Sequence, residues 1–184
     1  MLWRTLYSYT EEVSKSLNDH YMHPMNNQMM SRAYAEVRGS NLAPNLRGYV
    51  IFTNTPYGTE VFVEISGLPK YEPADGNEDP IGPHGFHIHE HGTCDIGDPD
   101  DPFQSAGGHW NPYNQPHGHH PGDFPVLFSN DGYTRMAFFT NRFTIEDVLG
   151  KSIIVHQNPD DYRTQPAGDA GKRIGCGVIQ VYPY

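Results

Sequence analysis

One histidine-rich stretch, residues 84–123, constrains what this chain can fold into more than any other feature. Strand side chains alternate between two faces with a period of two residues. A strand through residues 85–91 therefore places three histidines on one face and Phe86 and Ile88 on the other. This pattern predicts a strand that packs one face on a core and lines a site with the other. Eight of the eleven histidines lie in this stretch: His84, His87, His89, His91, His109, His117, His119 and His120.

The chemistry of these side chains predicts a metal centre. Histidine is the commonest neutral metal ligand at physiological pH, and so many in a short span are hard to explain by core packing. Further along, His117, His120 and Asp123 fall in a glycine- and proline-rich loop, and imidazoles with a carboxylate form a zinc-like ligand set. Several imidazoles without a nearby thiolate or thioether also suit copper(II). A histidine tag is a poor explanation, because strand and turn signals are interleaved with the histidines.

Length and charge narrow the class of protein. The 184 residues predict one domain with an appendage, and a net charge of −10 argues against non-specific nucleic-acid binding. No apolar run approaches the ~20 residues that span a bilayer. The N-terminus has no apolar signal-peptide segment, so either export does not use this route or the sequence is a processed or trimmed form. The compartment stays open: cell envelope or extracellular space if the chain is exported, and cytoplasm otherwise.

Residues 1–32 differ from the rest of the chain. An apolar residue recurs at three- and four-residue intervals, which predicts a helix over about 2–18; the residues are Leu2, Leu6, Tyr9, Val13 and Leu17. The following segment contains His20, His23 and several methionines, and thioethers suit copper(I). We favour a flexible polar linker for this segment over a copper site. We therefore divide the chain into an N-terminal segment, 1–32, and a main domain, 33–184.

After residue 32 the apolar pattern changes to a period of two. It predicts short strands at 33–38, 48–53, 59–66, 85–91, 125–129, 132–140, 151–156 and 173–182. Turn signals lie at 54–58 and 130–132, and a capped helical turn is expected at 144–147. Two long loops, 92–124 and 158–172, are the kind that carries function in a compact β domain. The pattern predicts an all-β, antiparallel sandwich or barrel of about eight strands.

Two cysteines, Cys94 and Cys176, allow one disulfide, with two free thiols as the alternative. If joined, they close a loop of about 80 residues. In the chain-entropy model such a loop stabilises the fold by roughly 4–5 kcal/mol.

Five motifs then make the sequence recognisable. They occur in the order GFHIHEHGTC, AGGHWNP, HPGD, SIIVHQNPDDYRTQP and GDAGKRIGCGVI. Together they resemble the bacterial type of copper/zinc superoxide dismutase over roughly residues 33–182. The resemblance implies an eight-stranded antiparallel Greek-key barrel or sandwich, one copper and one zinc ion, and conversion of superoxide to dioxygen and hydrogen peroxide by Cu(II)/Cu(I) cycling.

The resemblance also implies a role for each matching residue. Copper would be bound by His87, His89, His109 and His156. Zinc would be bound by His109, His117, His120 and Asp123. His109 would bridge the two ions and take and return a proton. Asp160 would link a copper-site histidine to a zinc-site histidine, Arg173 would attract the anionic substrate, and the Cys94–Cys176 pair would form the family disulfide.

Some assignments leave alternatives. His119 stands beside His120, and we choose His120 because the family pattern His-x-x-Asp selects it. We expect His84, His91 and His119 to face solvent. A non-catalytic copper- or zinc-binding protein for copper buffering or delivery is the alternative function, although such a protein has no need of Arg173 beside its copper. A structural zinc domain would leave the copper-site histidines without a role. Superoxide is the expected partner, and the sequence leaves a copper donor and a homodimer open.

Overall fold

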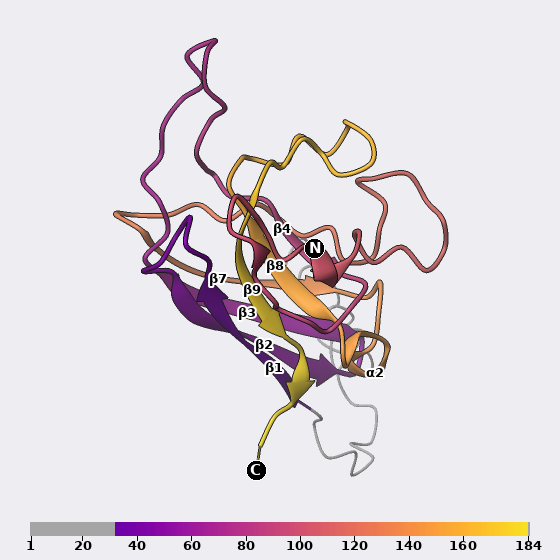
Figure 1. The fold of residues 1–184 in the computed structure, drawn as a ribbon. Coiled ribbons are helices and arrows are strands. Elements are labelled where there is room, and N and C mark those ends of the chain that lie inside the picture. The colour runs from indigo at the N-terminus through magenta and orange to yellow at the C-terminus, as the bar shows by residue number, and fades with distance from the viewer. Residues whose placement is uncertain (1–31, 184) are drawn as a thin grey trace, which may run out of the picture.

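The computed structural model describes residues 32–183, and nearly all of the regular structure in this range is β-strand (Figure 1). The longer strands are β1 Arg32–Gly39, β2 Arg47–Thr55, β3 Gly58–Ser66, β4 Phe86–His89, β7 Tyr133–Thr140, β8 Ser152–His156 and β9 Arg173–Val178. Short elements are β5 Gly97–Asp98, β6 Asp101–Pro102, the 3-10 helix η1 Gln104–Ala106, helix α2 Ile145–Val148 and β10 Gln180–Val181. The helix predicted over 2–18 and the histidine- and methionine-containing linker lie outside the described residues.

Eight strands form one curled antiparallel sheet. Its order is β4-β8-β9-β1-β2-β3-β7, and β10 pairs with β1. Figure 1 shows β1, β2, β3 and β7 on one side of the curl and β4, β8 and β9 on the other. The expectation of an all-β antiparallel fold is thereby confirmed. No helix in residues 32–183 combines the length and hydropathy needed to cross a membrane.

The core lies inside the curl, and the period-two pattern explains its composition. Ala33, Ala35 and Val37 of β1 are fully buried, as the alternation predicted, while their neighbours along the strand face outward. Phe86 and Ile88 of β4 are also fully buried. Removing this apolar surface from water is the main favourable term for folding. The histidine strand therefore has the packed apolar face that its sequence predicted.

The predicted turns are present. Asn130 and Tyr133 exchange backbone hydrogen bonds of 2.7 and 3.0 Å across Asp131 and Gly132. Both intervening residues have positive φ angles, 50° and 79°, as a tight hairpin turn requires. Thr144 and Asp147 form the expected capping box at the start of α2.

Three strand predictions need correction. The segment 125–129 is not a continuous strand, and only Leu127 makes a bridge, to His84. Pro125 has no amide hydrogen, and the amide of Val126 donates to the Tyr162 hydroxyl instead of to a strand. The segment 173–182 is split into β9 and β10.

Strand β4 ends earlier than predicted. The amides of Glu90 and His91 donate to the carbonyls of Gly108 and Ala106, so these residues bond to the following loop rather than to a strand. His91 is consequently exposed and does not share the buried face of His87 and His89.

Candidate metal centre

Paired strands bring three of the predicted copper ligands together. His87 and His89 lie two residues apart on β4 and are fully buried. On the neighbouring strand β8, Ile154 lies opposite His87. His156 follows Ile154 by two residues and therefore turns its ring to the same face. The sheet register thus places imidazoles from two sequence-distant segments side by side.

Backbone carbonyls orient two of these rings. The Nδ1 of His89 donates to the Gly107 carbonyl at 3.0 Å, and the Nδ1 of His156 donates to the Gly171 carbonyl at 3.2 Å. The Nε2 atoms then carry lone pairs, and they face each other at 3.3 Å. Two lone pairs at this distance repel each other. A cation bound by both atoms would remove the repulsion.

His109 stands between two ligand groups. The amide of the next residue, Trp110, donates to the Ile88 carbonyl at 2.8 Å, which seats His109 alongside β4. Its Nδ1 lies 3.3 Å from a carboxylate oxygen of Asp123. Its Nε2 is buried without a hydrogen-bond partner among the described residues. The ring belongs to one group with potential ligand atoms within 4.8 Å of one another, His87, His89, His109 and His156, and to a second such group, His109, His117, His120 and Asp123.

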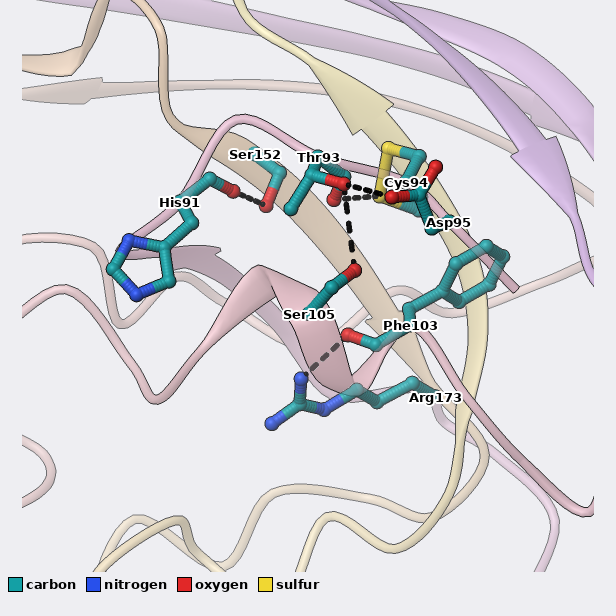
Figure 2. The surroundings of a disulfide bond; sticks show 9 residues. His91, Thr93, Cys94, Asp95, Phe103, Ser105, Ser152 and Arg173 are labelled. Atoms are coloured by element: carbon teal, nitrogen blue, oxygen red, sulfur yellow. Dashed lines mark hydrogen bonds between the residues drawn. A yellow bond between two sulfur atoms is a disulfide. The ribbon is translucent and has the colours of Figure 1, made fainter. Parts of the chain in front are cut away.

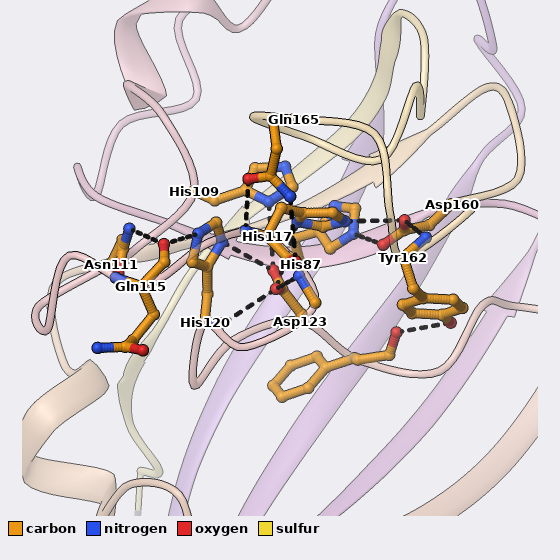
Figure 3. Close-up of polar contacts among 12 residues, drawn as sticks. His87, His109, Asn111, Gln115, His117, His120, Asp123, Asp160, Tyr162 and Gln165 are labelled. Atoms are coloured by element: carbon orange, nitrogen blue, oxygen red, sulfur yellow. Dashed lines mark hydrogen bonds and ion pairs between the residues drawn. The ribbon is translucent and has the colours of Figure 1, made fainter.

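The second group gathers around the Asp123 carboxylate (Figure 3). The Nε2 of His120 donates to the Gln115 carbonyl at 3.1 Å, so its Nδ1 is free to face Asp123 at 3.2 Å. The Nδ1 of His117 lies 3.3 Å from the other carboxylate oxygen. His120 is buried and His119 is exposed, which supports the choice of His120 as the ligand.

Asp160 connects the two groups. Its carboxylate accepts a hydrogen bond from His87 Nε2 at 2.7 Å and another from His117 Nε2 at 2.9 Å (Figure 3). Each bond leaves the Nδ1 of that ring as a lone-pair donor, which is how buried carboxylates orient metal-binding histidines. Gly168 is needed beside this carboxylate, because a Cβ there would collide with Asp160 and lie 2.5 Å from His117 Nε2.

The residues fit two metal ions. Three buried ring nitrogens of the site have no hydrogen-bond partner among the described residues: His87 Nδ1, His109 Nε2 and His117 Nδ1. Leaving such atoms unpaired is costly, and all three point into the two ligand groups. Imidazoles alone suit copper, and three imidazoles with a carboxylate suit zinc.

Burial and the neighbouring side chains keep three of the histidines and Asp123 in their metal-binding protonation states. It lowers the pKa of His87 and His89 well below the usual value and lowers the pKa of His156 to about 3, with neighbouring histidines adding to the effect. Burial alone would raise the pKa of Asp123, but the surrounding histidines, His109 foremost, bring it below its usual value. At neutral pH these rings are therefore neutral and Asp123 is ionised.

Comparisons with known proteins agree with this geometry. The profile of the family described as copper/zinc superoxide dismutase (SODC) matches residues 46–179. The chain belongs to the copper/zinc superoxide dismutase family. It is 40% identical over 151 residues to a Cu-Zn superoxide dismutase of Deinococcus radiodurans, covering 72% of this chain and 76% of that protein. It is 35% identical over 141 residues to one from Legionella pneumophila, covering 72% and 77%.

A solved structure supports the same assignment. The Cu/Zn superoxide dismutase from Brucella abortus aligns with a TM-score of 0.65 and 28% sequence identity. The alignment covers 81% of this chain and 99% of that one. Every position that the superoxide dismutase motifs assign to a metal is a histidine or aspartate in one of the two ligand groups.

Arg173 lies beside the copper-binding group of this superoxide dismutase. Its Nη1 donates to the Phe103 carbonyl at 2.8 Å (Figure 2). Arg173 is the register partner of His156 in the β8–β9 pair, so the two side chains start from neighbouring positions. After burial and the neighbouring groups, the charge of Arg173 also contributes to the lowered pKa of His89 and His156. Burial lowers the pKa of Arg173 itself, but a guanidinium stays protonated at neutral pH.

The disulfide of the superoxide dismutase motifs is present. Cys94 and Cys176 are joined with a Cα–Cα distance of 5.6 Å (Figure 2). The alternative of two free thiols is wrong. The bond ties the loop after β4 to β9, and it packs in a small apolar cluster with Phe103, Ala106 and Ile154.

The expectation that His84 faces solvent is wrong. This residue is 1% exposed, and its Nδ1 contacts the carbonyls of His156 at 3.0 Å and Gln157 at 3.1 Å. His91 and His119 are exposed, as expected. Sequence reasoning also missed the carbonyls of Gly107, Gly171 and Gln115, because a backbone acceptor has no residue-type signature.

Proposed function

We propose that this protein is a superoxide dismutase whose copper is held by one ligand group and whose zinc is held by the other. Two superoxide anions and two protons give one dioxygen and one hydrogen peroxide. The observation that carries the proposal is the His109 ring, whose two nitrogens face two different groups of buried ligands. A bridging imidazole of this kind suits one redox-active ion beside one redox-inert ion.

In this proposal the residues divide the work between electron transfer and positioning. Copper bound by His87, His89, His109 and His156 supplies one-electron exchange with superoxide, and zinc supplies a fixed positive charge beside the bridge. Asp160 keeps one ring of each group in the correct tautomer through its two hydrogen bonds.

We assign Arg173 the role of attracting and orienting the anion. Its guanidinium is half-buried and held by the Phe103 carbonyl, and its backbone pairs with that of His156 in the sheet. A fixed positive charge in a recess raises the local concentration of an anion even on an acidic protein. A copper-buffering or copper-delivery protein would not need this charge, so Arg173 favours the enzyme.

We assign His109 a proton-transfer role at Nε2. This atom has no hydrogen-bond partner within the described residues, so it can hold a proton whenever it is not bound to metal.

We also propose that the curled sheet closes into a Greek-key barrel through residues 124–130. His84 and Leu127 exchange backbone hydrogen bonds of 3.0 and 2.8 Å, and the Phe124 amide donates to the Phe86 carbonyl at 3.2 Å. The same segment continues through the Asn130–Tyr133 turn into β7. The division into 1–32 and 33–184, a copper donor and a homodimer stay as proposals from the sequence.

The test combines metal analysis with an assay of superoxide consumption on the purified full-length chain. We expect one copper and one zinc per chain and a turnover that disappears when copper alone is removed. Stoichiometric binding of both metals without superoxide consumption would instead favour the copper-buffering alternative.

A further inference from the structure

The 158–172 loop contacts the backbone of the segment that carries the zinc ligands His117, His120 and Asp123. These contacts involve residues that are not themselves metal ligands. Gln165 is the first of these contacts. Its Oε1 accepts the backbone N–H of His117 at 2.8 Å, and its Nε2 donates to the His117 carbonyl at 3.3 Å (Figure 3). Nε2 also donates to the Arg163 carbonyl at 3.1 Å, which anchors the amide within its own loop. One side chain thus grips both backbone polar groups of a zinc ligand.

Tyr162 is the second contact. Its hydroxyl donates to the Phe124 carbonyl at 3.1 Å and accepts from the Val126 amide at 2.8 Å. Both partners lie just after the zinc ligand Asp123. The backbone N–H of Tyr162 donates to an Asp160 oxygen at 2.7 Å, and the same oxygen accepts a hydrogen bond from the His117 ring. Figure 3 shows Tyr162 and Gln165 on the same loop, with Gln165 beside His117 and the Tyr162 ring directed away from the histidines, toward the backbone that follows Asp123.

A local turn sets the spacing of these two residues. One carboxylate oxygen of Asp161 accepts the amides of Arg163 and Thr164, each at 2.8 Å. The turn brings Tyr162 into a left-handed conformation, with φ of 57°, that a tyrosine rarely adopts. The strain is tolerated because the contacts on either side, to Asp160 and to the 124–126 backbone, require it.

We infer that Tyr162 and Gln165 form a clamp, a pair of positioning residues that sets how slowly this protein releases zinc. The clamp acts on the backbone of His117 and on the backbone following Asp123, while Asp160 orients the rings. Of the four copper ligands, His89 and His156 make no hydrogen bond with the clamp within the described residues, and the carbonyls of Gly107 and Gly171 hold their rings. The inference rests on the zinc assignment proposed above.

Two variants remove one contact each. Tyr162→Phe deletes only the hydroxyl and keeps the backbone N–H to Asp160. Gln165→Glu keeps an oxygen that accepts the His117 amide. It replaces the Nε2 donor with a second oxygen, which then faces the carbonyls of His117 and Arg163 and is repelled by both. Tyr113→Phe and Gln180→Glu are the matched controls, because both side chains are exposed and make none of the hydrogen bonds described here.

The measurement is release of zinc and of copper from the loaded full-length protein to an excess of chelator, followed over time. We expect zinc release to be faster by roughly tenfold in each clamp variant, the lower end of the roughly 10–100-fold loss of metal affinity that follows when outer hydrogen-bond partners of a metal site are removed. Copper release, and the unfolding temperature of the metal-free protein, should match the wild type. Cobalt(II) placed in the zinc site should show a changed visible spectrum in Gln165→Glu and an unchanged one in both controls.

Three outcomes overturn the inference. Unchanged zinc release in both clamp variants would do so while leaving the proposed function intact. So would equal acceleration of zinc and copper release with a lower unfolding temperature, which would mean a general structural role. A wild-type protein that binds no zinc at His117, His120 and Asp123 would overturn the proposed function as well.

Discussion

Proton placement on single imidazole rings decides the chemistry of this site. Five of its histidines donate one ring N–H to a protein oxygen: His87, His89, His117, His120 and His156. The remaining nitrogen of each ring then points a lone pair into a ligand group. The sixth, His109, faces both groups: its Nδ1 lies 3.3 Å from Asp123 of the zinc-binding group, and its Nε2 has no hydrogen-bond partner among the described residues. This arrangement suits a ring that must bind two ions and handle a proton.

Replacing Asp160 with asparagine should break this arrangement. An amide offers one acceptor and one donor where His87 and His117 both present N–H groups, so one of the two rings must move its proton to the metal-facing nitrogen. We expect affinity for copper or zinc to fall by roughly 10–100-fold. Metal retention against a chelator is the measurement, with the exposed Asp169→Asn as the control. Full retention of both metals would contradict the role assigned to Asp160.

Replacing Arg173 with glutamine should lower kcat/KM by roughly tenfold or more, because the anion loses its fixed positive charge. Copper and zinc contents should stay at the wild-type values. Arg173→Lys should recover part of the rate, and the exposed Arg163→Gln should change it little. The assay is superoxide consumption at several ionic strengths. If Arg173→Gln kept the wild-type rate and salt dependence, Arg173 would have no part in the mechanism.

At the scale of secondary-structure elements, loops supply most of the residues that complete the metal centre. Strands β4 and β8 supply the first three rings, but the zinc ligands, Asp160 and Arg173 come from the segments between strands or from a strand end. These loops are held by specific contacts: a disulfide on one side and a close glycine approach on the other. Perturbing either contact should therefore affect the site without changing the sheet.

Gly168→Ala tests the close approach. The new methyl group would collide with the Asp160 carboxylate, and φ is already +68°. We expect loss of bound zinc, measured by metal analysis after dialysis. Gly97→Ala is the matched control, since its φ of +61° imposes similar backbone strain with open space around the new Cβ. Equal zinc contents in the two variants would contradict the importance of the close approach to Asp160.

Removing the disulfide tests the other contact. Cys94 and Cys176 are 82 residues apart, so the chain-entropy model predicts a loss of roughly 4–5 kcal/mol on replacing both with serine. Denaturant unfolding of the metal-free protein measures this loss. The disulfide also fixes the loop that contains Phe103 against β9, and the Phe103 carbonyl holds Arg173. Without the disulfide Arg173 should be less well positioned, so kcat/KM should fall in the metal-loaded variant. An unchanged unfolding midpoint would contradict the stabilising role.

At the scale of the whole molecule, stability and pH are linked through the buried histidines. Burial holds His87, His89 and His156 below their usual pKa, with His156 at about 3. The unfolded chain takes up these protons near pH ~6.5, so between about 6.5 and 3 it binds more protons than the folded protein. The metal-free protein should therefore lose stability as pH falls through this window. Unfolding temperatures measured from about pH 7.5 down to about pH 4 test this, and a flat profile would contradict it.

Local spacing explains what the sequence alone determined. The period-two pattern predicted the ends of β1, β2, β3, β7 and β8 to within one residue, except for the C-terminal end of β2. It could do so because burial alternates along any half-buried strand. The shared face of His87 and His89 was predictable from their two-residue spacing, although the same rule included His91, which is exposed. The complete ligand set followed only from the resemblance to the superoxide dismutase motifs. The family pattern His-x-x-Asp selected His120, which is buried, over its exposed neighbour His119.

Tertiary packing alone decided which partner each side chain meets. The carbonyls of Gly107 and Gly171 orient His89 and His156, and the grip of Gln165 on His117 joins residues 48 positions apart. His84 is buried against His156 for the same reason, although its sequence context resembles that of a surface histidine. Every residue carries a backbone carbonyl, so no residue type marks the one that will accept a given proton. Only the packing of distant loops against β4 makes that choice.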